Sequence, residues 1–545
     1  MVQTQDPAGW VRVVVIVVPL VAPLVASLVA SLGSGARRGQ TRTATWVTVA
    51  AALTILVDGI VAATLTVGGA ALTTGSVLRV DALSSVMLIV IGSVGVIATW
   101  ASVGFVDGEV ASGEVSAGDI RRYATLLPVF LAAMALAVSV DNLGVLWAAI
   151  EATTIVTAFL VGHRRSRGSV EATWKYVMIC SVGIALAYLG TICVYYAARQ
   201  TSIPAHGALD WTQLAAHAHE LDPGVMRIAF ALLVLGFGAK AGMVPLHSWL
   251  PDAHSQAPAP VSALMSGVLL PVAVYALMRY RVIAVESLDL SFVRTLLLVV
   301  ALASLLLATS LIIAQRDYKR LLAYSSIEHM ALVVVGLAVG TQLAFAAVLL
   351  HIVGHGLGKA VLFCGAGQIL TAERTSQIAG VRGLLGRRPA LAACFGVGFL
   401  ALLGLPPFSL FTSELGLARA AAADGMGWVI AVALSLLGVV FVSIVVHLAP
   451  MVLGAGAASH PAAGPAVGPG SDLGSDPGQA TRTGTVTRPV ARTGIRTVTP
   501  TGTCAPAVGS PAPLVAGLVA LAVLGIVAWP LDQLLHAASL IGGTP

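Results

Sequence analysis

Residues 227–254 read RIAFALLVLGFGAKAGMVPLHSWLPDAH and place a lysine, Lys240, inside an otherwise apolar helix. A charged side chain near the centre of a bilayer costs about 2.5–3.5 kcal/mol on insertion scales, so such residues usually serve an ion or proton pathway. Residues that interrupt helical hydrogen bonding flank the lysine; they are Gly236, Gly238, Gly242 and Pro245. The stretch therefore predicts a broken membrane helix that carries a functional charge.

The composition is that of a polytopic membrane protein. Of 545 residues, 57% are hydrophobic and only 10% are charged, and the mean hydropathy is +0.93. The net charge of +6 comes from arginines scattered through short loops, which are typical topology signals and do not form one basic face. We therefore expect contact with the lipid bilayer and none with nucleic acid.

The cysteines form neither a CxxC pair nor a ligand cluster; they are Cys180, Cys193, Cys364, Cys394 and Cys504. The pattern indicates neither an iron–sulfur centre nor a disulfide framework. We expect no cofactor in this chain, and any redox chemistry then belongs to partner subunits.

About fourteen stretches meet the requirement of roughly 20 apolar residues for a membrane helix. They lie near 11–33, 44–68, 82–106, 123–140, 142–162, 171–198, 225–248, 258–280, 292–314, 318–340, 343–370, 390–418, 427–453 and 511–532. The first is too long for the apolar core of a signal peptide, about 7–15 residues, and is interpreted as an uncleaved span. The fold class is an all-α membrane bundle.

The spans group into units along the chain. We expect the N-terminal three helices in 1–122, five-helix units in 123–280 and 292–453, and a C-terminal helix in 511–545. Residues 454–510 are mostly Gly, Pro, Thr, Ala and Ser and predict a disordered cytoplasmic linker. Its arginines can touch anionic lipid, although a tolerated loop expansion is the simpler interpretation.

Positive charge in the loops predicts the orientation. Most loop lysines and arginines follow odd-numbered spans, which include the pairs Arg121 and Arg122 and Lys319 and Arg320. By the positive-inside rule these loops are cytoplasmic, and both termini then lie outside. We expect a multi-pass protein of a bacterial inner membrane.

Ionisable residues recur at membrane depth in several spans. They are Glu151, Lys240, Glu328, His329, His351, His355, Lys359 and Glu414. A single buried histidine is more often a packing residue than a functional one, and a scaffold in which the charges only pair is the structural alternative. The whole set favours a proton relay, which needs a series of groups tuned by burial and by their neighbours.

The spacing of these charges predicts an internal repeat. The interval from Glu151 to Lys240 nearly equals the interval from Glu328 to Glu414, and each crosses from the second to the fourth helix of a five-helix unit. Because five is odd, the second unit must be inverted in the membrane. The twelfth span is predicted to be broken like the seventh, since Gly404, Pro406 and Pro407 precede Glu414.

Two further polar groups lie near these spans. His351, His355 and Lys359 recur every four residues on one helical face. Zinc is a competing interpretation, but no HExxH motif or third ligand on the same helix supports it and the lysine repels a cation, so we expect no metal. A second group, at the end of span seven, can let protons in or out; its members are His247, Asp252 and His254. Anchoring by Trp249 at the membrane interface explains that group equally well.

Three motifs resemble a known family. KAGMVPLHSWLPDAHSQAPAPVSALMSG, RLLAYSSIEHM and LPPFSLFTSE are similar to the antiporter-like subunits of respiratory complex I, Mrp-type cation/proton antiporters and membrane-bound [NiFe] hydrogenases. The resemblance runs from about Val80 to Pro450. It implies an ion pair between Glu151 and Lys240, and a relay closed by Glu414.

Two features look more like one branch of that family. SSIEHM and the HxxxHxxxK row resemble the F-type membrane component of hydrogenase-4 or formate hydrogenlyase. This implies a non-catalytic, proton-translocating subunit with other membrane subunits and a peripheral [NiFe] hydrogenase-like arm as partners. A complex I-type NADH-quinone oxidoreductase subunit and an Mrp-type sodium/proton antiporter subunit are the alternatives. Many complex I relatives carry a lysine on span eight where this chain has Pro271, so the link between the two halves must run elsewhere.

Overall fold

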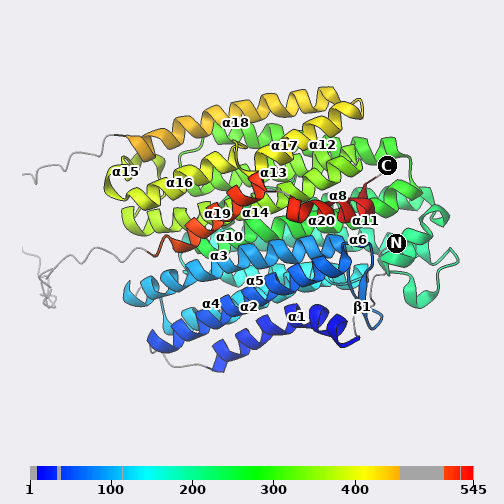
Figure 1. Cartoon of the computed structure of the whole chain (residues 1–545), viewed down its shortest axis with the longest axis horizontal. Coiled ribbons are helices and arrows are strands. Elements are labelled where there is room, and N and C mark those ends of the chain that lie inside the picture. The colour runs from blue at the N-terminus through cyan, green and yellow to red at the C-terminus, as the bar shows by residue number, and fades with distance from the viewer. Residues whose placement is uncertain (1–8, 33–37, 113–114, 455–508, 528, 544–545) are drawn as a thin grey trace, which may run out of the picture.

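The computed structural model describes residues 9–32, 38–112, 115–454, 509–527 and 529–543. These residues form a bundle of helices that run side by side along one direction (Figure 1). The only strands in the described part are β1 (Leu72–Thr74) and β2 (Leu78–Val80), which pair antiparallel. The expected all-α bundle is therefore confirmed. The predicted linker at 454–510 falls almost entirely outside the described residues.

The helices divide at the middle of the chain. The first part contains α1 (Gly9–Leu32), α2 (Arg38–Thr66), α3 (Ala82–Ser112), α4 (Ala117–Val138), α5 (Leu143–Val161), α6 (Arg167–Ala198), α7 (Trp211–Ala216), α8 (Pro223–Lys240), α9 (Trp249–Gln256), α10 (Ala259–Leu264) and α11 (Leu270–Ser287). The second part contains α12 (Leu290–Ile313), α13 (Tyr318–Val339), α14 (Gln342–Glu373), α15 (Leu384–Arg387), α16 (Pro389–Leu402), α17 (Ser409–Ala423), α18 (Gly427–Leu453), α19 (Ala512–Ile526) and α20 (Trp529–Gly542). Short helical turns are η1 (Ala205–Gly207), η2 (Ala218–Glu220) and η4 (Ile378–Gly380), and η3 (Met265–Leu269) is a π-helix between α10 and α11.

Within the described residues, 12 helices are long and apolar enough to cross a membrane, and the bent pair of α19 and α20 would make 13. α16 is apolar but has only 14 residues, because its span is interrupted before α17. The bundle therefore agrees in kind with the predicted one, while its exact number of spans stays a prediction.

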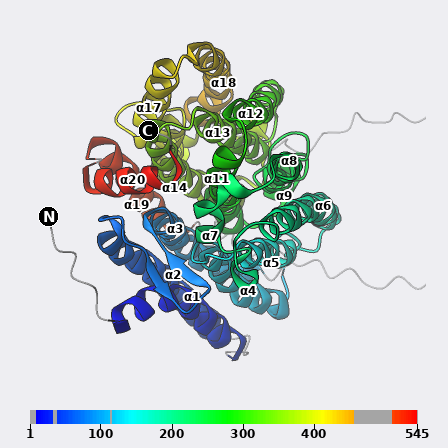
Figure 2. The same ribbon diagram turned by 90° about the vertical axis from the view of Figure 1, so that its right-hand side faces the viewer.

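Burial separates central from peripheral helices. The apolar window of α14 is 100% buried inside the protein, whereas that of α18 is only 22% buried. Seen along the helices, α14 lies in the interior and α18 lies at the rim (Figure 2). Large apolar side chains on the rim, such as Val446, are exposed, as a surface that faces lipid requires. His351, His355 and Lys359 of α14 thus lie fully buried in the interior of the bundle.

Two interruptions divide membrane helices, as predicted, and their backbones match. After α8, Gly242 adopts a φ of +80° and the Met243 N–H donates to the Gly238 carbonyl over 2.7 Å. After α16, Gly404 adopts a φ of +64° and the Leu405 N–H donates to the Leu400 carbonyl over 3.2 Å. These are αL terminations, which favour glycine. A cis proline follows in each interruption, Pro245 in one and Pro407 in the other.

The chain departs from the predicted spans at two places. The helix expected at 225–248 ends at Lys240, and α9 begins after an eight-residue connection. The count of apolar residues had included this connection in the span. The single helix expected at 511–532 is two helices, and Pro530 lies in the first turn of α20, where no backbone N–H is needed. α19 packs on α14, α16 and α17, and α20 packs on α14 and α3, so this pair closes one side of the bundle (Figure 2).

Candidate functional site

Lys240 is the last residue of α8 and is 1% exposed. Its Nζ donates to Thr154 Oγ1 on α5 over 2.7 Å and to the Tyr176 hydroxyl on α6 over 2.8 Å. The Tyr176 ring also lies 5.0 Å from the ammonium, at cation–π distance. The amino group is thus held at the first interruption by two hydroxyl groups.

Glu151 lies one turn before Thr154 on α5, and the expected ion pair with Lys240 is not direct. Among the described side chains, no carboxylate lies within ion-pair distance of the Lys240 ammonium, and Thr154 occupies the place beside it. Glu151 still interacts electrostatically with Lys240, while its Oε2 is buried without a hydrogen-bond partner. The structure therefore places a threonine between the two residues of the implied ion pair, and their role in a relay stays a prediction.

The second part of the interrupted helix, α9, packs against α6 and α13. Trp249 is fully buried and its Nε1 donates to the Ala239 carbonyl over 3.0 Å, so the alternative that it anchors the chain at the membrane interface is wrong. Asp252 accepts from Lys175 over 2.9 Å and from Arg320 over 2.6 Å, and its side chain is 23% exposed. His247 lies within the interruption and is partly exposed.

His254 follows Asp252 in the sequence group that predicts a proton entrance or exit, but the structure places it inside. The side chain is 0% exposed and stacks on Phe363 of α14 at 4.8 Å between ring centroids. Neither ring nitrogen has a hydrogen-bond partner among the described residues. It interacts electrostatically with Lys359, so it faces the second half of the protein and not the surface.

α14 carries a second buried lysine, Lys359. Lys359 is 0% exposed; its Nζ donates to the Leu322 carbonyl over 2.9 Å and to Ser325 Oγ, both on α13. Glu328, one turn further along α13, is 4% exposed and interacts electrostatically with this lysine. Both residues that the sequence placed in the relay therefore lie in one buried cluster.

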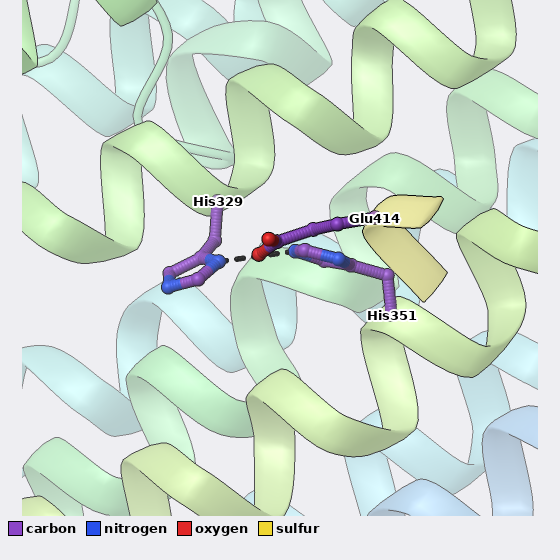
Figure 3. A group of neighbouring side chains, drawn as sticks. All are labelled: His329, His351 and Glu414. Carbon is purple, nitrogen blue, oxygen red and sulfur yellow. Dashed lines mark hydrogen bonds between the residues drawn. The ribbon is translucent and has the colours of Figure 1, made fainter. Parts of the chain in front are cut away.

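Histidines continue from this cluster toward the second interruption. His355 is buried with neither ring nitrogen paired, and its ring centroid lies 5.2 Å from that of His329. His329 Nδ1 and His351 Nε2 are 3.0 Å apart, and His351 Nδ1 lies 3.0 Å from Ser413 Oγ on α17. Figure 3 shows Glu414, also on α17, with its carboxylate directed at these two rings.

The hydrogen bonds around His351 determine its protonation pattern. Ser413 Oγ donates its proton to the Leu410 carbonyl over 2.8 Å, so it accepts from His351 Nδ1. Neutral His351 then presents Nε2 as an acceptor, and His329 must donate from Nδ1. The Nε2 of His329 is therefore the atom that accepts a further proton.

Pro271 lies in the first turn of α11, directly after the π-helix η3. The π-helix η3 crosses α14 closely at Gly267. A Cβ on Gly267 would lie 2.9 Å from the Gly356 carbonyl oxygen of α14. This crossing lies between His355 and Lys359 in the α14 sequence. The π-helix directly before Pro271 therefore packs on the part of α14 that carries His355 and Lys359.

Sequence reasoning missed the hydroxyl groups that hold these residues. Thr154, Tyr176, Ser325 and Ser413 contact the charged groups directly. Serine and threonine are common in membrane helices, where they also bond their own backbone, so their presence carried no specific signal. Only the helix faces that pack together reveal them.

Comparisons with known proteins identify a family model and several relatives that match this chain. Residues 140–441 match the family described as NADH:quinone oxidoreductase/Mrp antiporter, transmembrane. The chain is 39% identical over 340 residues to the hydrogenase-4 component F homolog of Methylacidiphilum infernorum. The aligned region covers 62% of this chain and 71% of that protein. The chain is 30% identical over 350 residues to hydrogenase-4 component B of Escherichia coli, covering 62% of this chain and 50% of that protein.

Solved structures share the fold across nearly the whole chain. The Mrp complex from a Dietzia species superposes with a TM-score of 0.78 at 21% identity, covering 97% of both chains. The archaeal membrane-bound sulfane sulfur reductase gives a TM-score of 0.75, also at 21% identity and 97% coverage of both chains. At this identity the likeness shows the fold and not the activity.

Proposed function

Because the chain belongs to the NADH:quinone oxidoreductase/Mrp antiporter family, we propose that its buried row of glutamates, lysines and histidines moves protons across the membrane. The protein is then a non-catalytic, proton-translocating membrane subunit of a hydrogenase-4-like oxidoreductase complex. The observation that carries the proposal is the row itself: titratable side chains lead from the first helix interruption through α14 to the second, at a depth where each one is costly.

Protons reach the first half beside Asp252. This carboxylate is a partly exposed side chain of α9 and lies with Lys175 and Arg320 on the side predicted to be cytoplasmic. Lys240 then exchanges a proton while Thr154 and Tyr176 hold its nitrogen in place. A lysine suits this step because an ammonium can give up its proton when buried, whereas a guanidinium does not.

The two halves connect through His254, Lys359 and His355. Histidines with unpaired ring nitrogens in a buried position are unusual, because buried polar atoms normally find a partner. Both His254 and His355 have this property and both interact electrostatically with Lys359. Water between them completes a connection that replaces the span-eight lysine of complex I relatives.

The second half passes the proton toward Glu414. A proton that arrives on His329 Nε2 lets Nδ1–H move to His351 Nε2 across their 3.0 Å hydrogen bond. An imidazole can pass a proton along because one ring nitrogen accepts while the other donates. Glu414 accepts from this pair and releases the proton on the opposite side of the membrane.

The assembly follows from the relatives. Proteins of this family named after hydrogenase-4, Mrp and complex I are membrane subunits of larger assemblies, and we expect neighbouring membrane subunits here too. A peripheral [NiFe] hydrogenase-like arm would supply the electrons, in a bacterial inner membrane with both termini outside. Hydrogen evolution from reduced methyl viologen by the purified complex tests that arm, and its absence would contradict it.

Lys240 is the residue that tests the relay. The native complex is reconstituted in proteoliposomes and driven by reduced methyl viologen, while a pH-sensitive dye follows proton movement. Lys240→Ala and Lys240→Arg should both reduce proton movement to background although the complex still assembles. Arg199→Ala, which removes an exposed charge at the end of α6, is the matched control and should behave as wild type. Near-normal proton movement in both Lys240 variants contradicts the proposal.

A further inference from the structure

Three side chains at the second interruption have the arrangement of a metal site. His329, His351 and Glu414 come from α13, α14 and α17, and each offers one ligand atom within 4.8 Å of the others. Both histidines are buried and the glutamate is partly buried. Figure 3 shows the two rings and the carboxylate converging on one point. α14 thus supplies one ligand, and the other two come from the neighbouring helices α13 and α17.

The donor set selects a class of ion. Two imidazoles and one carboxylate with a position left open are typical of Zn²⁺, with bonds of about 2.0–2.2 Å. Adjacent ligands of a tetrahedral site then lie roughly 3.3 Å apart, and the two histidine nitrogens are already 3.0 Å apart. Nitrogen ligands favour zinc, nickel or copper over magnesium, calcium or sodium, which prefer oxygen.

Surrounding groups support the same three ligands. Ser413 Oγ accepts from His351 Nδ1, which directs Nε2 toward the centre of the group, as second-shell hydrogen bonds do in metal sites. Gly404 gives the glutamate room, since a Cβ there would lie 2.4 Å from Glu414 Oε2. Glu328 interacts electrostatically with Glu414 and adds negative charge against a dication, while its neighbour Lys359 offsets part of that charge.

We propose that His329, His351 and Glu414 bind a divalent transition-metal ion of the Zn²⁺ class. The ion takes the place of the hydrogen bond between the two histidines: the proton on His329 Nδ1 moves to Nε2 of the same ring, and both ligands stay neutral imidazoles. Metal binding itself follows from the positions of the three ligand side chains and does not require the proposed function. A second consequence rests on the proposed function: an ion at this point interrupts the path from His329 to Glu414 and stops proton movement.

Metal binding to the purified complex tests the site directly. Equilibrium dialysis with Zn²⁺ should show one site per chain that His351→Ala and Glu414→Gln each weaken by more than about 100-fold. Ser413→Ala, which removes the orienting hydrogen bond, should weaken it by about 10–100-fold. His355→Ala is the matched control, because this histidine is on the same helix but outside the ligand group, and Zn²⁺ binding should persist.

The outcomes separate the site from the relay. Unchanged Zn²⁺ affinity in His351→Ala and Glu414→Gln overturns the proposal, as does the absence of a site in the wild-type complex. Co²⁺ provides a second readout, since its absorption bands should report tetrahedral coordination in wild type and disappear in either ligand variant. If Zn²⁺ binds as predicted but leaves proton movement in proteoliposomes unchanged, the metal site stands and the relay through these histidines fails.

Discussion

The charge of the first interruption lies on the helix before the break, whereas that of the second lies on the helix after it. Lys240 is the last residue of α8, and the matching last residue of α16 is Leu402. Glu414 instead reaches back from α17 to Gly404. The ammonium of Lys240 thus lies at a helix C-terminus, where the helix dipole favours a positive charge. Glu414 lies beyond the first turn of α17, and its carboxylate lies beside Gly404 at the end of α16.

This difference shows what an interrupted helix provides. One break creates both a C-terminal and an N-terminal end inside the membrane, so the same backbone can stabilise a charge of either sign. Such stabilisation amounts to about 0.3–1 kcal/mol at exposed sites and up to about 2 kcal/mol when partly buried. The break therefore determines how deep in the membrane a charge can lie. The helix end that lies beside the side chain determines which sign of charge is stabilised.

The largest effect should come from the charge of the second break. Glu414→Gln removes the last proton acceptor but keeps the shape of the side chain, so proton movement in proteoliposomes should fall to background, as for Lys240→Ala. Glu414→Asp should retain part of it. If Glu414→Gln moves protons normally, the two breaks do not serve one path and the comparison fails.

A smaller effect should separate charge from contact around Lys240. Glu151 acts on this lysine at a distance, so Glu151→Asp should keep part of the proton movement and Glu151→Gln should lose most of it. Thr154 acts by contact, so Thr154→Ser should be nearly normal and Thr154→Val impaired. Proton movement is measured with the same dye assay, and equal loss in the Asp and Gln variants would speak against electrostatic action.

The two glycines of the breaks offer a sharper contrast. Gly242→Ala and Gly404→Ala each force a side chain into a positive φ, which costs about 1–2 kcal/mol, so both should lower the thermal unfolding midpoint of the complex similarly. At Gly242 the new Cβ meets the end of Leu250 closely and is in ordinary contact with Ile327, whereas at Gly404 it meets the Glu414 carboxylate. Proton movement should therefore fall further in Gly404→Ala. A larger loss in Gly242→Ala would reverse this assignment.

The smallest effect should come from outside both breaks. Residues 459–503 contain too few large apolar side chains to form a packed core, and the free energy of loop closure changes only slowly with loop length. Deleting Ser459 to Thr503 should leave membrane insertion and proton movement almost unchanged. A strong loss of proton movement at normal expression would mean that this segment binds a partner.

Sequence reasoning identified the bundle and both interruptions because their signals are local. Apolar length predicts a membrane helix, and glycine and proline near a charge predict a break. The same reasoning placed Glu328, His329, His351, His355 and Lys359 on adjacent spans, and the structure brings them into one buried cluster. Their roles in transport stay predictions.

The remaining features depend on which helix faces meet. His254 looked like part of a surface group because it follows Asp252 closely, but two residues along a helix rotate the side-chain direction by roughly 200°, to nearly the opposite face. The indirect link of Glu151 to Lys240 depends on Thr154 packing between helices. The ligand group of His329, His351 and Glu414 joins three helices, and spacing along one helix carries no trace of it.

The central claim is that one buried path joins the two interruptions through α14. The most direct test is the ratio of protons moved to hydrogen evolved, measured in proteoliposomes for His254→Ala, His355→Ala and Lys359→Ala. The account predicts that this ratio falls steeply in all three variants and partly in His351→Ala, with the complex still assembled. A wild-type ratio in all of them would contradict the path through α14 and leave its buried histidines with a packing role.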